Sequence, residues 1–386
     1  MDRIAQLDEE LCAAGYRLRK AQPRGAERLT MELQAQDGTI CAGQWHADAA
    51  EAARVAALVV GRFGPESVDV LGDGRLLVQH RGADRRLPVL FRLVRDGATL
   101  VAHRPERRAV VRLDGRGYVK VVRPGSTAQV VEPLRLLRMD DVRLPRVIAD
   151  DDRRGVVTLS VVAGRTMLAC AGDATRPDDD LAADVARVGA AVSRLHRHPV
   201  HLDRTPHDTT AEVAAARRWL AAATDHRLLA PDAWRSLLDA TIARLPDAPA
   251  RLSLLHRDLH DKQVVLSPGE QVGLLDLDLA TRGDPAVDLA NLVAHIDLRV
   301  RQGVCSERRG ARCATALLEG YAPAPDVLAR IAPYVALTRL RLAGVYAFRP
   351  DTRGLVAGLL EAARTRTTEL PDLRAPVSPT GLLAPR

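Results

Sequence analysis

Two short apolar runs on either side of a turn constrain the fold of this chain more than any other feature. Residues 264–267 (Val-Val-Leu-Ser) form the first run, residues 268–271 (Pro-Gly-Glu-Gln) the turn, and residues 272–277 (Val-Gly-Leu-Leu-Asp-Leu) the second run. Apolar runs of this length around proline and glycine predict an antiparallel β-hairpin. A turn centred on Gly269 and Glu270 would pair the last residue of the first run with the first residue of the second.

Polar residues lie next to both predicted strands. The register above places Gln263 directly opposite Asp276, and residues opposed in this way have Cβ atoms roughly 4.5–5.5 Å apart. One hard divalent cation could take an oxygen from each and complete its shell with water and phosphate oxygens, as Mg²⁺ does in nucleotide sites. Asp258 lies on the loop that leads into the first strand, so we expect it close to the same metal.

These residues resemble the catalytic and metal-binding segments of the aminoglycoside phosphotransferase and choline kinase family, which is related to the protein kinases. The family pattern is His-x-Asp-x-x-x-x-Asn followed by an Ile-Asp or Leu-Asp pair, and this chain has His256, Asp258 and Gln263 at that spacing, then Leu275-Asp276. The resemblance implies that Asp258 is the catalytic base and that Gln263 and Asp276 hold Mg²⁺. Gln263 departs from the pattern, which has asparagine at this position. Glutamine keeps the amide oxygen but adds a methylene, which shifts or weakens the second metal contact.

A segment further along the chain strengthens the resemblance. Residues 283–290 (Gly-Asp-Pro-Ala-Val-Asp-Leu-Ala) predict the start of a helix, since Asp284 is a good N-cap and Pro285 suits the first helical position. The resemblance implies that Asp288, the second acid of the segment, braces the catalytic loop. It assigns His256 to the same structural support.

A phosphate-binding site of this kind also needs a lysine on a strand well upstream of the catalytic loop. The chain has only three lysines, which are Lys20, Lys120 and Lys262. Lys120 lies in the second of two apolar runs, residues 109–113 and 118–122, which predict two strands joined by a tight turn. We therefore expect Lys120 to contact the nucleotide phosphates.

The helix expected after this hairpin offers a partner acid for the lysine. Glu132 is the candidate, and with Lys120 it completes the predicted nucleotide-binding pair. Pro133 lacks a backbone donor, so we expect it to kink or restart the helix. Upstream, residues 103–108 (His-Arg-Pro-Glu-Arg-Arg) stand where related enzymes have a small or glycine-rich flap. These arginines either contact phosphate or form a solvated turn.

Bulk composition excludes several classes of function. The net charge of +7 comes with only 3% aromatic residues, and no aromatic-interleaved basic patch suggests a nucleic-acid partner. No apolar span is long enough to cross a bilayer, so we expect no membrane association. The five scattered cysteines form neither a disulfide framework nor a zinc pattern, which favours the cytoplasm. The oligomeric state stays open.

The predicted fold class is α+β, a two-lobed, protein-kinase-like fold with an added N-terminal unit. We expect an α/β extension of unknown role at residues 1–95, a small β-rich nucleotide-binding lobe at 96–163, and a mostly helical lobe with the catalytic and metal-binding loops at 164–370. Residues 371–386 are expected to be a flexible tail.

The expected function is a Mg²⁺-dependent transfer of the γ-phosphate of ATP or GTP to a hydroxyl of a small molecule. An aminoglycoside-like antibiotic, a sugar and an amino alcohol all stay open as acceptors. One alternative is a kinase-like pseudoenzyme that binds a nucleotide or a partner without turnover, which the glutamine at position 263 favours. The other is a metal-dependent hydrolase that uses His256, Asp258, His260 and Asp261.

Overall fold

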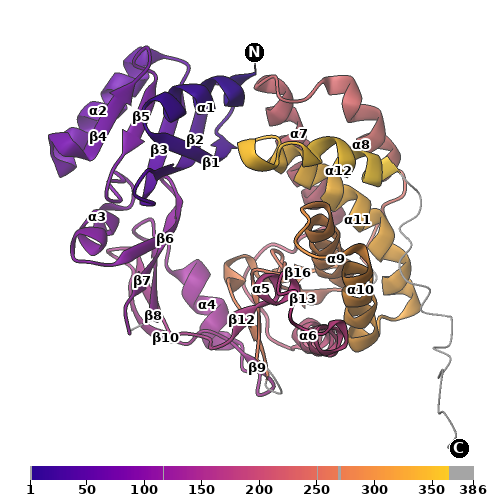
Figure 1. Ribbon diagram of the computed structural model, residues 1–386. Helices are drawn as coiled ribbons and strands as arrows, with labels where there is room; N and C mark the ends of the chain where they lie inside the picture. The colour runs from indigo at the N-terminus through magenta and orange to yellow at the C-terminus, as the bar shows by residue number, and fades with distance from the viewer. Residues whose placement is uncertain (1, 116, 250, 268–270, 365–386) are drawn as a thin grey trace, which may run out of the picture.

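The computed structural model describes residues 2–115, 117–249, 251–267 and 271–364. These residues form an N-terminal unit, a sheet-rich lobe and a helical lobe, which follow one another around a ring in Figure 1. The α+β fold with a β-rich lobe and a helical lobe, predicted from the sequence, is confirmed.

The N-terminal unit is a five-stranded antiparallel sheet in the order β1-β2-β3-β5-β4. Helix α2 covers one face through residues such as Val55 and Val59, which pack with Leu77. Helix α1 packs on the other face with Leu76 and Val78, because neighbouring strand residues point to opposite faces. The elements are α1 (Arg3–Ala13), β1 (Tyr16–Pro23), β2 (Arg28–Ala35), β3 (Ile40–His46), α2 (Ala49–Phe63), the 3₁₀ turn Pro65–Ser67, β4 (Val68–Leu71) and β5 (Leu76–Gln79).

The second lobe is built on another five-stranded antiparallel sheet, in the order β10-β11-β8-β7-β6. Helix α3 packs on one face through Leu90, against Val111 and Val119. Helix α4 covers the opposite face through Val130 and Leu134. The elements are α3 (Pro88–Arg95), β6 (Thr99–Arg104), β7 (Arg108–Leu113), β8 (Gly117–Val122), α4 (Ala128–Leu136), β9 (Val142–Arg143), β10 (Val147–Asp151) and β11 (Val156–Leu159). Helix α3 also contacts the N-terminal unit, because the ring of Phe91 lies 5.1 Å from that of Phe63 in α2.

The helical lobe carries the predicted hairpin at its junction with the sheet lobe. Its strands are β12 (Arg165–Thr166), β13 (Ser253–Leu255), β14 (Val264–Leu266), β15 (Val272–Leu274) and β16 (Thr281–Gly283). Its helices are α5 (Met167–Ala171), α6 (Asp178–Arg197), α7 (Thr209–Asp225), α8 (Arg235–Ile242), α9 (Pro285–Arg301), α10 (Glu307–Tyr321), α11 (Pro325–Tyr346) and α12 (Leu355–Arg364), with 3₁₀ turns at Pro231–Ala233, Leu277–Leu279 and Pro350–Thr352.

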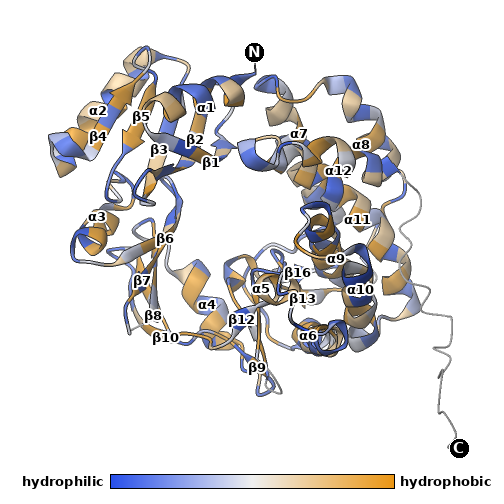
Figure 2. Cartoon of the chain, viewed as in Figure 1, coloured by the Kyte–Doolittle hydropathy of each residue, from blue (hydrophilic) through white to orange (hydrophobic). Residues whose placement is uncertain are grey.

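Hydrophobic and hydrophilic residues alternate along these helices (Figure 2), and their apolar sides form the core. The predicted N-cap of α9 is present, because the side chain of Asp284 accepts a hydrogen bond from the backbone N–H of Ala286 and Pro285 is the first helical residue. No helix within the described ranges has the length and apolar character that crossing a membrane requires. The expected tail at 371–386 lies outside the described residues.

The N-terminal unit contacts both lobes. Towards the sheet lobe, strands β2 and β3 pack against β6. Towards the helical lobe, the backbone N–H of Ala21 in β1 donates to the carbonyl of Phe348 at 2.9 Å, and Arg353 binds the carboxylate of Asp2 at 2.6 Å. The N-terminal unit therefore contacts both the sheet lobe and the helical lobe.

Candidate active site

The hairpin forms, but its register differs from the predicted one. Val264 pairs with Leu274, so Gln263 lies opposite Leu275, whose N–H donates to the Gln263 carbonyl at 2.8 Å. The expected opposition of Gln263 and Asp276 is wrong by one residue, because five residues rather than four separate the paired strand ends. A slip of one residue moves a side chain to the other face of a strand.

The two side chains nevertheless meet. Asp276 has left-handed backbone angles, φ 60° and ψ 49°, and begins a 3₁₀ turn instead of continuing the strand. This turn returns its carboxylate to the side of Gln263, whose amide Nε2 lies 3.3 Å from Asp276 Oδ2. The alternation of side chains between the two faces of a strand could not predict this contact. The contact forms only because the strand ends before Asp276, where the backbone turns.

Two cationic side chains from the sheet lobe hold the acids of this loop. The ammonium of Lys120 lies 2.7 Å from Asp276 and 2.7 Å from Asp278. Arg108, at the start of β7, donates to both oxygens of Asp276 and to Asp278, each at 3.2 Å. Sequence reasoning assigned no role to Asp278, although it lies in the Leu-Asp-Leu-Asp motif, and it left Arg108 among the flap arginines as either a phosphate contact or part of a solvated turn.

The two carboxyl groups differ in their electrostatics. Burial acts to raise the pKa of Asp276, but the charges of Lys120 and Arg108 outweigh it and hold that pKa well below the ordinary value. At Asp278, burial and the neighbouring Asp276 outweigh Lys120, and the pKa lies above the ordinary value. Asp276 is therefore ionised more readily than Asp278, and an added cation would favour the charged form of both.

Asp288 fixes the backbone of the candidate catalytic loop, which comprises residues 256–263. This buried carboxylate accepts the backbone N–H groups of His256 at 2.6 Å and Arg257 at 2.8 Å, and its Oδ2 lies 3.1 Å from the ring of His196. The ring of His256 in turn bonds the carbonyl of Leu275 at 2.7 Å. His256 and Asp288 thus connect the loop that carries Asp258 to the loop that carries Asp276.

Asp258 itself is partly exposed, and among the described residues no side chain bonds its carboxylate. Its negative charge acts on the arginines Arg104, Arg108 and Arg257. The backbone N–H of Asp258 donates to His256 Nδ1 at 3.3 Å. Its backbone is therefore fixed by the loop, while its carboxylate stays available to a bound molecule.

The expected pairing of Glu132 with Lys120 is not found, because Lys120 is turned toward Asp276 and Asp278. Glu132 contacts Arg204 instead, at 3.3 Å. Pro133 does not restart the helix, since α4 continues through it from Ala128 to Leu136.

Arg204 explains why α4 tolerates its proline. Pro133 offers no N–H to the carbonyl of Gln129, and that carbonyl accepts a hydrogen bond from Arg204 at 3.0 Å. The same guanidinium donates to the carbonyls of Asp278 at 2.7 Å and Ala280 at 3.0 Å. Arg204 therefore ties α4 to the loop that carries the acids, a connection without a signal in the local sequence.

The flap at residues 103–108 is neither a glycine-rich loop nor a simple solvated turn. Asp84 of the preceding loop accepts the backbone N–H of Glu106 at 2.6 Å and lies 3.0 Å from His103 Nε2. The buried carboxylate of Glu106 binds Arg28 at 2.5 Å and Arg85 at 2.8 Å. The N-terminal unit therefore holds the flap, and this fixes the start of β7, from which Arg108 reaches the site.

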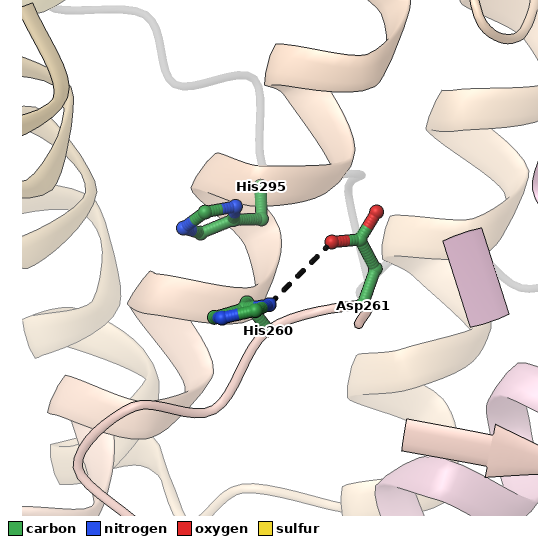
Figure 3. A group of neighbouring side chains, drawn as sticks. All are labelled: His260, Asp261 and His295. Carbon is green, nitrogen blue, oxygen red and sulfur yellow. Dashed lines mark ion pairs between the residues drawn. The ribbon is translucent and has the colours of Figure 1, made fainter. Parts of the chain in front are cut away.

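One further group of metal-ligand side chains lies beside the catalytic loop. Ligand atoms of His260, Asp261 and His295 lie within 4.8 Å of one another, and the two imidazole rings stack with centroids 4.9 Å apart (Figure 3). Arg299, however, donates to both oxygens of Asp261, at 2.6 and 2.8 Å. A metal would have to compete with this guanidinium, and both ring nitrogens of His256 are bonded within the loop region. The four residues of the alternative hydrolase site thus share no common centre.

The residues of the candidate active site lie within a segment that matches a known protein family. A model of the "Phosphotransferase enzyme family" matches residues 91–334, more than half of the chain. No curated protein matches.

Similar solved structures include an aminoglycoside phosphotransferase, APH(3'')-Id from Streptomyces rimosus, which is 23% identical over 64% of this chain and 93% of its own length, with a TM-score of 0.48. A choline/ethanolamine kinase family protein from Mesorhizobium loti is 17% identical over 71% of this chain and 90% of its own, with a TM-score of 0.49. The macrolide 2'-phosphotransferase MphH from Brachybacterium faecium is 16% identical over 92% of this chain and 97% of its own, with a TM-score of 0.37.

Proposed function

Because this chain belongs to the phosphotransferase enzyme family, which confirms the resemblance seen in its motifs, we propose that it transfers the γ-phosphoryl group of ATP or GTP to a hydroxyl of a small molecule. The observation that carries the proposal is the convergence of Lys120 from the sheet lobe with Asp276 and Gln263 from the helical lobe. The partly exposed Asp258 lies on the loop tied to theirs.

Each residue has a role that its surroundings support. Asp258 orients the acceptor hydroxyl, whose oxygen forms the new bond to phosphorus as the bond to the leaving β-phosphate oxygen breaks. The hydroxyl proton passes to the Asp258 carboxylate, and the nucleoside diphosphate leaves with the electron pair. Lys120 and Arg108 place positive charge beside the phosphates, and catalysis of this kind is mostly positioning and charge neutralisation.

The donor set fits Mg²⁺. Asp276, Asp278 and Gln263 offer carboxylate and amide oxygens, which this ion prefers, and the two carboxylates already accommodate the positive charges of Lys120 and Arg108. These three residues would hold the ion. When bound, Mg²⁺ neutralises charge on the β- and γ-phosphate oxygens. Glu132 acts in this proposal only through Arg204, as a support of the nucleotide-binding loop.

The proposal is tested on the full chain with Asp258→Asn. We expect the variant to bind Mg²⁺–ATP or Mg²⁺–GTP as the wild type does, and to lose phosphoryl transfer by at least about a hundredfold. Nucleotide consumption is measured across a panel of hydroxylated acceptors, and binding by calorimetry with each nucleotide. Asp73→Asn, which removes a mostly exposed carboxylate, is the matched control.

Two outcomes count against the proposal. Wild-type turnover in Asp258→Asn would show that another group takes the proton. Nucleotide binding by the wild type without consumption under any acceptor would favour the pseudoenzyme, the alternative suggested by the glutamine at position 263.

A further inference from the structure

Cationic side chains bind every carboxylate oxygen of the two acids proposed to hold Mg²⁺. Lys120 donates to Asp276 Oδ1 at 2.7 Å, and to the two oxygens of Asp278 at 2.7 and 2.8 Å. Arg108 donates to both oxygens of Asp276 and to Asp278 Oδ2, each at 3.2 Å. A dication on the same oxygens would lie beside these like charges. One of the two cations therefore has to release the acids before a metal ion binds them.

Arg108 is the cation that is more easily released. Its side chain is 25% exposed, whereas that of Lys120 is 8% exposed. Its hydrogen bonds to the acids are also longer than those of Lys120. Release of the ammonium would leave a buried charge without its partners, which is costly. The guanidinium of Arg108 can turn toward solvent instead.

A bound nucleotide would offer the released guanidinium a second anion. In nucleotide sites the metal ion joins the protein carboxylates to the phosphates, so the phosphates lie beside the same acids. A guanidinium presents two parallel donors, which match the oxygens of a phosphate as well as those of a carboxylate. Arg108 already uses this fork on Asp276, with one terminal nitrogen on each oxygen. It can therefore exchange one pair of oxygens for another.

The N-terminal unit holds the backbone from which Arg108 extends. Glu106, two residues earlier, has left-handed backbone angles with φ 62°, and its side chain is buried. Its carboxylate binds Arg28 of β2 at 2.5 Å and Arg85 at 2.8 Å. A non-glycine residue keeps such a backbone only where its surroundings fix it. Here the two arginines of the N-terminal unit supply that restraint.

The sheet lobe holds the same residue from its other side. Arg123, which directly follows β8, donates through Nε to the carbonyl of Glu106 at 2.7 Å. Strand β8 also carries Lys120. Because the backbone of the flap is fixed by two parts of the fold, any exchange of partners at this point falls to the side chain of Arg108.

We propose that Arg108 alternates between two anions, the acid pair Asp276 and Asp278 and the phosphates of the nucleotide, and that it leaves the acids when Mg²⁺ binds them. The N-terminal unit positions Arg108 for this exchange through Glu106. The inference rests on the proposed function for the identity of the nucleotide site. It makes metal and nucleotide binding interdependent, because the nucleotide attracts the same guanidinium that competes with the metal.

The first test measures metal binding and requires neither nucleotide nor turnover. Mn²⁺, which prefers the same oxygen ligands as Mg²⁺, is titrated into the full chain and followed by electron paramagnetic resonance. We expect Arg108→Gln to bind Mn²⁺ about tenfold more tightly than the wild type, because a competing charge is removed. Arg112→Gln removes a mostly exposed guanidinium from the same strand and should leave the Mn²⁺ affinity unchanged.

A gain in metal affinity cannot come from loss of the fold, since unfolding would remove the site. Adding Asp276→Asn to Arg108→Gln should abolish the gain, which locates the ion at this acid. Equal Mn²⁺ affinity of Arg108→Gln and the wild type would overturn the proposal. So would a gain that persists when the Asp276 carboxylate is removed.

The second test measures nucleotide binding by calorimetry, with a non-hydrolysable ATP or GTP analogue and Mg²⁺. We expect Arg108→Gln to weaken binding of the analogue about tenfold, opposite in sign to its effect on Mn²⁺ alone. Unchanged binding of the analogue would show that the guanidinium does not move to the phosphates. Both tests use binding alone, so a chain that binds the analogue without consuming nucleotide would refute phosphotransfer and leave this inference intact.

Glu106→Gln tests the positioning by the N-terminal unit. It should shift both affinities in the same directions as Arg108→Gln, by a smaller factor, because the guanidinium is less precisely placed. Glu51→Gln, which removes a surface carboxylate paired with Arg54 in the same unit, should change neither affinity. In the Arg108→Gln background, Glu106→Gln should have no further effect on Mn²⁺ affinity, since coupled residues are not additive. Additive effects in the double variant would show that Glu106 does not act through Arg108.

Discussion

Two residues of the site adopt the left-handed backbone that favours glycine, Arg257 with φ 69° and Asp276 with φ 60°. A non-glycine residue in this region costs about 1–3 kcal/mol and persists only where the surroundings fix it. The N–H of Arg257 is held by Asp288, and the carboxylate of Asp276 by Lys120 and Arg108. The backbone strain thus lies at Arg257, just before Asp258, and at Asp276 itself, where the chain turns these two acids toward the site.

The contact between Gln263 and Asp276 depends on the length of the glutamine. An asparagine on the same backbone falls short of Asp276 by about one carbon–carbon bond, since the present contact is already 3.3 Å. We therefore expect Gln263→Asn to weaken Mg²⁺-dependent nucleotide binding about tenfold, measured by titration with and without Mg²⁺. A gain in nucleotide affinity or turnover would show instead that the glutamine impairs the site.

Asp288 makes stability depend on pH. Burial acts to raise its pKa, but His196, His256 and the loop N–H groups hold the pKa below the ordinary value. A carboxyl whose folded pKa is lowered stabilises the fold above its unfolded pKa of about 3.9, and this contribution is lost as the pH falls through the folded value. We expect Asp288→Asn to lose about 3 kcal/mol at pH 7.

The measurement is urea unfolding of Asp288→Asn and wild type at pH 7 and at several pH values below about 3.9, because the contribution is lost only below the unfolded pKa. The difference between them should shrink toward the acid end, and Asp73→Asn should stay within about 0.5 kcal/mol of the wild type throughout. A difference that is independent of pH would mean that the carboxylate charge does not carry the effect.

At the scale of elements, Arg204 connects helix α4 to the loop that carries Asp276 and Asp278. The expected pair of Lys120 and Glu132 does not make this connection. Arg204 compensates the carbonyl freed by Pro133 and also holds the carbonyls of Asp278 and Ala280. Glu132 contributes one contact to the same guanidinium and is about one third exposed. The position of the acids therefore depends on Arg204 more than on Glu132.

We expect Arg204→Met to leave three carbonyl groups without this donor and to destabilise the fold by about 1–3 kcal/mol. Nucleotide affinity should fall with it, since Asp278 loses its backbone support. Glu132→Gln, which removes only the charge, should have a small effect on both. Thermal unfolding and nucleotide titration of the two variants distinguish the roles, and equal losses would show that Arg204 needs the charge of Glu132 to hold the carbonyl groups.

The sequence predicted the elements better than the contacts between them. Hydrophobic periodicity and turn residues were sufficient to predict the β14–β15 hairpin and helices such as α9. They could not show which partners Arg108 and Arg204 bind, because these partners lie 168 and 74 residues away in the chain. The roles of the acids stay predictions, while their convergence with Lys120 is a property of the fold.

At the scale of the whole molecule, the N-terminal unit shares a continuous apolar core with the helical lobe. Aromatic rings mark the junction: His226 of the helical lobe packs edge-on to Trp45 of β3 and to Phe348. The ring of His226 also donates to the carbonyl of Gly25 at 3.0 Å. Docking of this unit on the helical lobe therefore depends in part on this aromatic junction.

This docking should weaken in mild acid. Burial lowers the pKa of His226, and Arg3 adds to this, against opposing contributions from Gly25 and Asp225. A histidine whose folded pKa is lowered binds its proton preferentially when exposed, so its stabilising contribution is present above about pH 6.5 and is lost as the pH falls below it. We expect hydrogen exchange in α1 and β1 to accelerate, after correction for intrinsic rates, between about pH 7.5 and 5.5.

His226→Gln tests the cause, since glutamine retains a donor for Gly25 and does not titrate. The variant should reduce the pH dependence of exchange in α1 and β1 without abolishing it, because burial lowers the pKa of His46 in β3 as well. Exchange in β7 and β8, whose sheet lies in the other lobe, provides the internal control. If His226→Gln leaves the pH dependence unchanged, protonation at the aromatic junction does not govern docking. The acid sensitivity of the N-terminal unit would then have to come from His46 within its own sheet.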